Sequence, residues 1–176
     1  MIRVDRGELA EVNTQAILRP VTSDWAAVTP AMRRLELAAG PVVERQCRSL
    51  GELPVGSAVV TGAGDLAAEF IVHVIVRSVE QPVTAAGVRK ALGSGLRRLE
   101  EWGITGVAMP LLGTGAGNLD AEDSAALVLS VLAAAEQERR TPAEIVIVAD
   151  SDYEETAVRT RLLAAGQPVE DPPGGV

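Results

Sequence analysis

The sequence is poor in aromatic side chains and has one residue each of cysteine and histidine. Aromatic residues make up 2% of the 176 residues, so the core must be built from Ala, Val, Leu and Ile, and a ligand site cannot depend on many stacking rings. The single cysteine, Cys47, excludes an internal disulfide. The single histidine, His73, argues against a metal site built from histidines. We expect no metal and no cofactor.

Long apolar runs and clusters of basic residues are also missing. No run approaches the roughly 20 residues that a membrane-spanning helix needs. The 16 basic and 24 acidic residues give a net charge of −8, and the basic residues are spread along the chain without forming a run. Binding to a nucleic-acid backbone needs a concentrated positive field, so neither a nucleic acid nor a membrane is an expected partner. The lone thiol and the lack of a signal-like leader predict a cytoplasmic location, and the oligomeric state is left open.

What is present is an alternation of short apolar runs with longer segments of helical period. This pattern is typical of a layered α/β sheet, and the length fits one domain. Most of the apolar runs are continuous, as in strands covered on both faces. The strands are expected at Ile2 to Asp5, Ala16 to Pro20, Ser57 to Thr61, Phe70 to Val76, Gly106 to Met109 and Ile145 to Val148.

Helices are expected between most of these strands. Apolar residues at spacings of three and four predict an amphipathic helix from about Val88 to Trp102. Further helices are expected from about Asp120 to Glu138 and from Tyr153 to Ala165. The segment from Pro30 to Leu50 is also helical in pattern, broken by Gly40 and Pro41. The domain should cover residues 1–166, with 167–176 as a flexible tail that has no periodic apolar face.

One segment carries a chemical signal, because a buried strand runs into a glycine-rich turn and then into a helix. Gly113, Gly115 and Gly117 alternate along this turn, which spans Gly113 to Asn118. Glycine admits backbone angles barred to other residues and leaves the N–H groups open to a ligand, so such a turn can wrap an anion. The pattern is neither a Walker loop nor the usual dinucleotide fingerprint. The alternative is that the glycines only make a tight strand-to-helix connection.

Three segments carry a resemblance: Leu-Pro-Val-Gly-Ser-Ala-Val-Val-Thr-Gly-Ala-Gly-Asp-Leu (53–66), Phe-Ile-Val-His-Val (70–74) and Met-Pro-Leu-Leu-Gly-Thr-Gly-Ala-Gly-Asn-Leu (109–119). In that order and spacing they resemble the macrodomain family, which binds ADP-ribose and includes Appr-1″-p processing proteins. It covers roughly residues 1–165 with one gap. It implies a three-layer α/β/α fold with a mixed sheet of about six strands.

The resemblance also implies binding residues. The loop over the diphosphate and distal ribose would consist of Gly113, Thr114, Gly115, Ala116, Gly117 and Asn118. Glu8 would stand where the family has the acidic residue that receives the adenine amino group, and Leu9 would lie beside the base. Glu8 can also be read as an ordinary exposed turn carboxylate, because exposed acids are common.

The sequence departs from the family where catalysis would reside, so the catalytic residues stay unknown. The family's asparagine-rich segment corresponds to Arg19 to Thr22, which has no asparagine, and the glycine-rich loop that follows corresponds to Ser23 to Pro30, which has no glycine. After the last strand, where the family often has an aromatic residue against adenine, the sequence has Ala149-Asp150, and the nearest ring is Tyr153.

Four other residues have competing interpretations. His73 lies in a run of Ile and Val, which favours a core histidine with a hydrogen-bond partner over a base or a ligand. Cys47 falls on a helix without a second cysteine or histidine nearby in sequence, which favours an inert thiol. Trp25 could stack on a base or pack against the sheet. Asp24 is the one carboxylate of the altered segment and could replace a missing base, although a solvated acid is the simpler interpretation.

Three functions are compatible with these observations. The preferred one is a divergent macrodomain that binds ADP-ribose, a related nucleotide or another phosphorylated small molecule, without hydrolase activity. The second is an ADP-ribosyl hydrolase or O-acetyl-ADP-ribose deacetylase with a remodelled site. The third is a scaffold that has lost ligand binding; the complete glycine turn argues against it, and the altered segment from Arg19 to Pro30 argues against the second.

Overall fold

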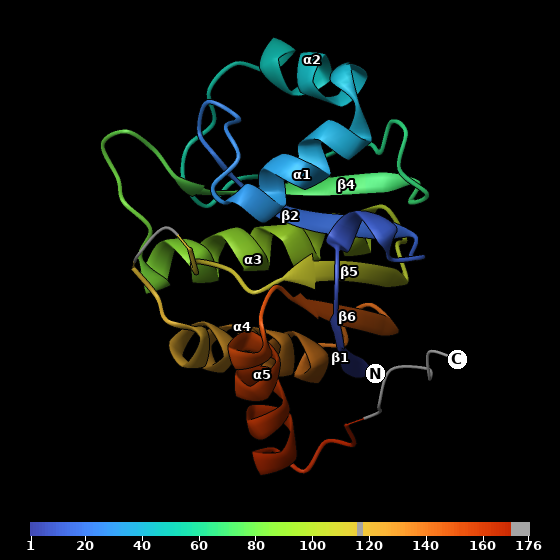
Figure 1. Cartoon of the computed structure of the whole chain (residues 1–176), viewed down its shortest axis with the longest axis vertical. Helices are drawn as coiled ribbons and strands as arrows, with labels where there is room; N and C mark the ends of the chain where they lie inside the picture. The colour runs from blue at the N-terminus through green and yellow to red at the C-terminus, as the bar shows by residue number, and fades with distance from the viewer. Residues whose placement is uncertain (116–117, 170–176) are drawn as a thin grey trace.

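The computed structural model describes residues 1–115 and 118–169. Over these residues the chain forms a six-stranded sheet with helices on both faces (Figure 1). The strands are β1 (Ile2–Arg6), β2 (Ala16–Thr22), β3 (Ala58–Gly62), β4 (Phe70–Arg77), β5 (Gly106–Pro110) and β6 (Glu144–Ala149). The helices are the short 3₁₀ turn η1 (Leu9–Glu11), α1 (Pro30–Ala39), α2 (Pro41–Ser49), α3 (Ala85–Glu101), α4 (Ala121–Gln137) and α5 (Asp152–Ala164).

The predicted α/β architecture is confirmed. Each predicted strand forms, and the helical segment after Pro30 is divided at Gly40 and Pro41 as its sequence indicates. Gly40 has a φ of 86°, in the left-handed region that glycine tolerates, and Pro41 opens α2, where a missing N–H is harmless. The 3₁₀ turn η1 was not predicted, because three residues carry too little periodicity to be recognised.

The sheet is mixed, with strand order β1-β6-β5-β2-β4-β3. The edge strand β3 runs antiparallel to β4, and the other neighbours are parallel. The carboxyl ends of the five parallel strands therefore meet at one edge, which we call the carboxyl edge. The chain leaves β2 toward β4 and β3, and it leaves β5 toward β6 on the opposite side. The position between β2 and β5 is thus a topological switch point, where open α/β sheets bind ligands.

Two apolar layers hold the helices to the sheet. Alternate residues of the central strands, such as Ile17, Ile71 and Ile75, face α1, α2 and η1. The intervening residues, such as Leu18 and Val74, face the other layer, which α3, α4 and α5 complete. Figure 1 shows α1 and α2 gathered at the β2 and β4 side of the molecule and α4 and α5 at the β6 and β1 side.

The last described residues extend past the predicted domain boundary. Val169 is partly buried and packs against the layer formed with α3, α4 and α5. Residues 170–176 lie outside the described part of the chain, so the limit at residue 166 and the flexible tail stay predictions. Within the described residues no helix has the length and apolar character to cross a membrane.

Candidate functional site

The glycine turn follows β5 directly and lies at the switch point. Gly113 has a φ of 84° and Gly115 a φ of 74°, so both need the left-handed conformation that glycine adopts without strain. The N–H groups of Thr114 and Gly115 have no hydrogen-bond partner among the described residues. Successive N–H groups in such a turn form a concave nest that suits an anion.

Two side chains of the predicted loop are already engaged within the chain. The hydroxyl of Thr114 donates to Glu154 Oε1 at 3.2 Å. The amide of Asn118 donates from Nδ2 to the carbonyl of Val83 at 2.6 Å, which ties the loop to the segment after β4. Ala116 and Gly117 lie outside the described residues. What the turn offers a ligand is therefore its backbone, and the role of all six predicted loop residues stays a prediction.

The amino terminus of α1 lies against this turn but is a poor anion site. A Cβ on Gly115 would stand 2.7 Å from Thr29 Cγ2, so the turn and the start of α1 are in contact. Thr29 caps the helix by accepting from the N–H of Met32, and Pro30 has no N–H to give. Ala31 is left as the position of that first turn whose N–H can serve a ligand. This is a physical reason why the altered segment cannot hold a phosphate as a free helix end would.

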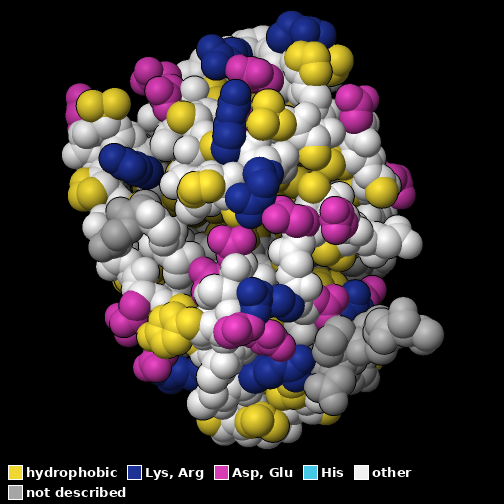
Figure 2. Space-filling view, in the orientation of Figure 1, with side chains coloured by type: hydrophobic (Ala, Val, Ile, Leu, Met, Phe, Trp, Pro, Cys, Tyr) yellow, Lys and Arg dark blue, Asp and Glu magenta, His cyan; other side chains and the backbone are white. Residues whose placement is uncertain are grey.

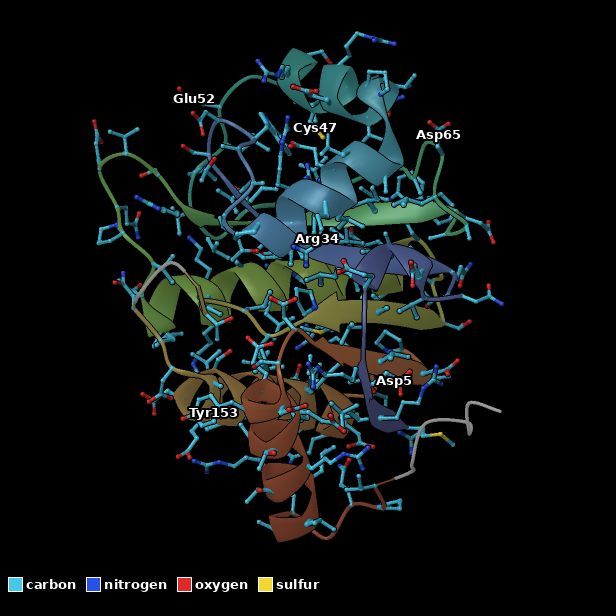
Figure 3. The ribbon with its side chains drawn as sticks, viewed as in Figure 1. Asp5, Arg34, Cys47, Glu52, Asp65 and Tyr153 are labelled. Carbon is cyan, nitrogen blue, oxygen red and sulfur yellow. The ribbon has the colours of Figure 1, made fainter. Side chains whose placement is uncertain are left out.

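Arg34, which the sequence did not suggest as a site residue, lies at the end of the site where the resemblance would put adenine. Glu8, after β1, accepts from Arg34 Nε at 3.1 Å with each carboxylate oxygen, and Arg34 Nη2 reaches Asp150 Oδ1 at 3.4 Å. Arg34 comes from α1, as Figure 3 shows. Leu9, expected beside the base, is 6% exposed and packs beneath α1. The assignment of Glu8 and Leu9 to adenine stays a prediction.

Glu154 joins the glycine turn to the segment after β6. Besides Thr114, its carboxylate accepts from the backbone N–H of Asp150 at 2.8 Å. Arg34 and Glu154 were both missed as site residues. A usable signal was available for each, because α1 and α5 follow the carboxyl ends of β2 and β6 and so begin at the carboxyl edge. Which acid pairs with which arginine cannot be read from spacing alone.

The altered segment after β2 folds inward at Trp25. Trp25 is 5% exposed, has a left-handed φ of 71°, and donates from Nε1 to the carbonyl of Gly51 at 2.7 Å. Its ring contacts His73 edge-on, with centroids 5.8 Å apart, so Trp25 packs in the core. Asp24 stays exposed, and a hydrogen bond from Thr22 lowers the pKa of its carboxyl group. A lower pKa makes Asp24 a weaker base.

Arg19 and His73 form a buried polar pair away from the carboxyl edge. Arg19 is 2% exposed, and its Nε donates to His73 Nδ1 at 2.9 Å. Because arginine can only donate, Nδ1 must accept, which puts the ring proton on Nε2, 2.8 Å from Thr61 Oγ1. Burial, with the charge of Arg19 beside the ring, holds the pKa of His73 well below its ordinary range. His73 is therefore a neutral core histidine, as its sequence context favoured.

The rest of this buried cluster comes from α1 and α2. Glu36 Oε1 lies 3.7 Å from Arg19 Nη1, which makes an ion pair but no hydrogen bond. Cys47 Sγ lies 3.7 Å from His73 Nε2, and burial raises the pKa of the thiol (Figure 3 labels Cys47 on α2). A thiol with a raised pKa in a closed core is a poor nucleophile, in agreement with the inert interpretation of Cys47. No three ligating side chains gather for a metal ion within the described residues.

Tyr153 does not lie beside Glu8 and Leu9, the residues that were predicted to bind adenine. It is 56% exposed and lines a hollow between α4 and α5 with Glu122, beside α4 as Figure 3 shows.

A hollow of about 320 Å³ lies at the opposite, amino edge of the sheet, bordered by Ile2, Pro142 and Ile145. It contains neither the glycine turn nor the acids of the carboxyl edge, so volume alone does not locate the chemistry. Figure 2 shows basic and acidic side chains interleaved over the displayed face, with no broad patch of either sign.

The fold is an α/β domain with a glycine turn at the switch point of its sheet. The model of the Macro domain family matches residues 30–128, which is 99 of the 176 residues, and the chain belongs to this family. A macrodomain of Oceanobacillus iheyensis, solved with ADP, superimposes with a TM-score of 0.81 at 17% identity, covering 92% of this chain and 90% of that one. The recognition of the family from three sequence segments and the three-layer mixed sheet are thus confirmed.

Relatives in sequence are spread over archaea and bacteria. An uncharacterised protein of Aeropyrum pernix is 33% identical over 138 residues, 75% of this chain and 72% of that protein. O-acetyl-ADP-ribose deacetylase 1 of Pantoea vagans is 28% identical over 153 residues, 84% of this chain and 90% of that protein. An uncharacterised Mycobacterium bovis protein is 24% identical over 131 residues, and the match spans 74% of this chain and 37% of that longer protein.

Proposed function

We propose that the chain binds a phosphorylated small molecule, ADP-ribose or a compound that shares its phosphate and ribose, at the glycine turn. The observation that carries the proposal is the pair of left-handed glycines, Gly113 and Gly115, at the switch point of a Macro domain. The N–H groups of Thr114 and Gly115 have no partner among the residues that the structure describes, so they can serve an anion. The solved macrodomain with ADP supports a nucleotide-like ligand. The net charge of −8 is no obstacle, because the attraction is local to the turn.

We propose further that the chain does not hydrolyse this ligand. Arg19, the first residue of the segment that corresponds to the family's asparagine-rich one, is buried, and its Nε donates to His73 in the core. Thr22 is engaged with Asp24, and the ring of His73 is fully buried. The carboxylate at the turn, Glu154, accepts hydrogen bonds from Thr114 and from the N–H of Asp150, so it is not poised as a general base. The second candidate, an O-acetyl-ADP-ribose deacetylase with a remodelled site, is favoured by the relative that bears that name.

The proposal is tested by calorimetric titration with ADP-ribose, AMP, pyrophosphate and inorganic phosphate, in the wild type and in Gly115→Val. We expect heat of binding with at least one of these ligands in the wild type. We expect none in Gly115→Val, because its Cβ would be 2.7 Å from Thr29 Cγ2 and its φ of 74° is strained for a β-branched residue.

Gly103→Val is the matched control for that substitution. Gly103 also has a left-handed φ, 64°, but a Cβ there meets open space at the far end of α3. Both variants should lose some stability from backbone strain, measured by thermal melting, and only Gly115→Val should lose binding. No heat with any of the four ligands, or unchanged affinity in a folded Gly115→Val variant, would make the glycine turn a mere connector.

A further inference from the structure

An elongated ligand anchored at the glycine turn has two directions open to it along the carboxyl edge. In the strand order, β6 and β1 lie to one side of β5, and β2 and β4 to the other. On the β4 side, the hydrogen bond from Asn118 to the carbonyl of Val83 closes the turn against the next segment. On the α1 side, Thr29 is in contact with Gly115. A ligand longer than its phosphate group must therefore extend toward the ends of β6 and β1.

The first obstacle in that direction is a negative charge. Glu154 lies against Thr114 with one carboxylate oxygen and accepts from the N–H of Asp150 with the other. A second phosphate that followed a first one out of the turn would approach this carboxylate, and like charges at close range repel. The surroundings of the turn thus favour a ligand with a single phosphate over a diphosphate.

The second obstacle is the bridge that Arg34 makes over the ends of β1 and β6. Its Nε occupies both oxygens of Glu8, and its Nη2 reaches Asp150. The amino group of a nucleotide base is a hydrogen-bond donor, and at Glu8 it would compete with the Nε–H of Arg34 and meet a cation in front of the carboxylate. The residues that would receive a base therefore bind each other.

From these contacts we propose that the site takes a compact sugar phosphate, and that Arg34 is the specificity-determining residue that excludes a nucleotide base. This inference rests on the proposed function, since it needs a phosphate in the glycine turn. Arg34 and Glu8 are about half exposed, with side-chain exposures of 48% and 44%, so the bridge is a surface ion pair. Such pairs are weak, and the selectivity they create is correspondingly moderate.

The test compares ribose 5-phosphate with ADP-ribose by calorimetry in the wild type and in Arg34→Ala. In the wild type we expect ribose 5-phosphate to bind at least as tightly as ADP-ribose, because the adenosine half gains no contacts and Glu154 repels the second phosphate. In Arg34→Ala we expect ADP-ribose to bind about fivefold more tightly than in the wild type, with ribose 5-phosphate unchanged, because freeing Glu8 removes a surface pair of this strength. The side chain is exposed and alanine suits a helix, so the variant should fold.

Arg33→Ala is the matched control, because Arg33 is the next residue on α1 and pairs with Glu36, away from Glu8. It should leave both affinities unchanged. In Arg34→Ala, adding Glu8→Ala removes the acceptor and should return ADP-ribose to its wild-type affinity, which would identify Glu8 as the acceptor.

Two results separate failure of this inference from failure of the proposed function. One result is that wild-type ADP-ribose binding is more than tenfold tighter than ribose 5-phosphate binding and weakens in Arg34→Ala. Arg34 would then help to bind the adenine base, and the inference would be overturned while the proposed function stands. If neither ligand binds the wild type or the variants, the proposed function is overturned and the inference with it.

Discussion

His73 is held in the neutral form by its position in the chain of hydrogen bonds from Arg19 to Thr61. Protonation of Nδ1 would set two donors against each other, and the guanidinium of Arg19 is already the charge in that part of the core. The unfolded chain has no such restriction, and its histidine takes up a proton near the ordinary pKa of 6.5. Below that pH the unfolded state binds more protons than the folded state, so acid favours unfolding.

We predict that the free energy of unfolding falls by about 1.4 kcal/mol for each pH unit below about 6.5, down to the region near pH 5 where carboxylates begin to contribute. Above 6.5 this contribution is fully present. Urea denaturation at several pH values measures it, and the chain has one histidine, which simplifies the assignment. His73→Asn keeps an acceptor for Arg19 Nε, and this variant should lose the slope. An equal slope in both proteins would mean that other groups cause it.

Arg19 shows where prediction from single residues stops. Its place in a strand was correct, and alternation along β2 puts it on the same face as Ile17 and Val21. Its partner His73 is 54 residues away, in a strand whose pairing with β2 the sequence did not specify. Trp25 was undecided for the same reason, because its contact with His73 depends on that pairing.

Two of the three glycines of helix α3, Gly93 and Gly95, lie two residues apart in opposite surroundings. Gly93 faces open space, where an added Cβ would touch nothing within 4 Å. Gly95 lies over the sheet, and a Cβ there would stand 2.9 Å from Leu18 Cδ1 and from Val74 Cγ1. Both contact residues are fully buried, and the valine is stiff because it is β-branched.

We predict opposite signs for alanine at these two positions. Gly93→Ala should stabilise the fold by about 0.5–1 kcal/mol, since alanine is the better helix former. Gly95→Ala receives the same gain, but overpacking of the core costs about 1–3 kcal/mol and should leave it destabilised. Chemical denaturation of the two variants beside the wild type measures both values. Stabilisation by Gly95→Ala would mean that Leu18 and Val74 can move away at little cost.

Element boundaries were predictable where the ends of the helices carry capping chemistry. Ser151 accepts from the N–H of Glu154 at the start of α5, and Asp120 does the same for Asp123 at the start of α4. The acids at the start of α4 also explain why that helix is less suited to a phosphate than the glycine turn before it. The start of α3 was missed although Thr84 caps it: the helix begins at Ala85, three residues before the predicted start, because Ala85 and Ala86 lack the periodic pattern that marks the later turns.

For the whole molecule we expect ligand binding without catalysis. We predict that turnover of O-acetyl-ADP-ribose and of ADP-ribosylated protein does not exceed the uncatalysed rate, because Glu154, the carboxylate at the turn, is engaged by Thr114 and by the N–H of Asp150. A chromatographic assay of product release with each substrate measures this. Asp24→Asn is the decisive variant, because Asp24 is the one carboxylate of the altered segment. Turnover that disappears in Asp24→Asn would establish a new active site and contradict the proposal.

The fold of the whole molecule was far more predictable than the ligand site. Patterning and three family-like segments suffice for the sheet and its layers, because many apolar positions contribute to each element. The site depends on a few side chains whose partners lie on other elements, such as Arg34 with Glu8 and Asp150. A resemblance transfers the position of Glu8 but not the arginine that faces it.

The pairing of β2 with β4 has a consequence for how the sheet finds its alignment. In the native alignment Ile17 lies opposite Ile71, Arg19 opposite His73 and Val21 opposite Ile75. A slip of two residues would keep every side chain on its face and leave the aliphatic contacts nearly intact, so apolar patterning cannot reject it. It would, however, put the guanidinium of Arg19 opposite an isoleucine, where a buried charge has no acceptor. The buried pair of Arg19 and His73 thus specifies the register of β2 against β4.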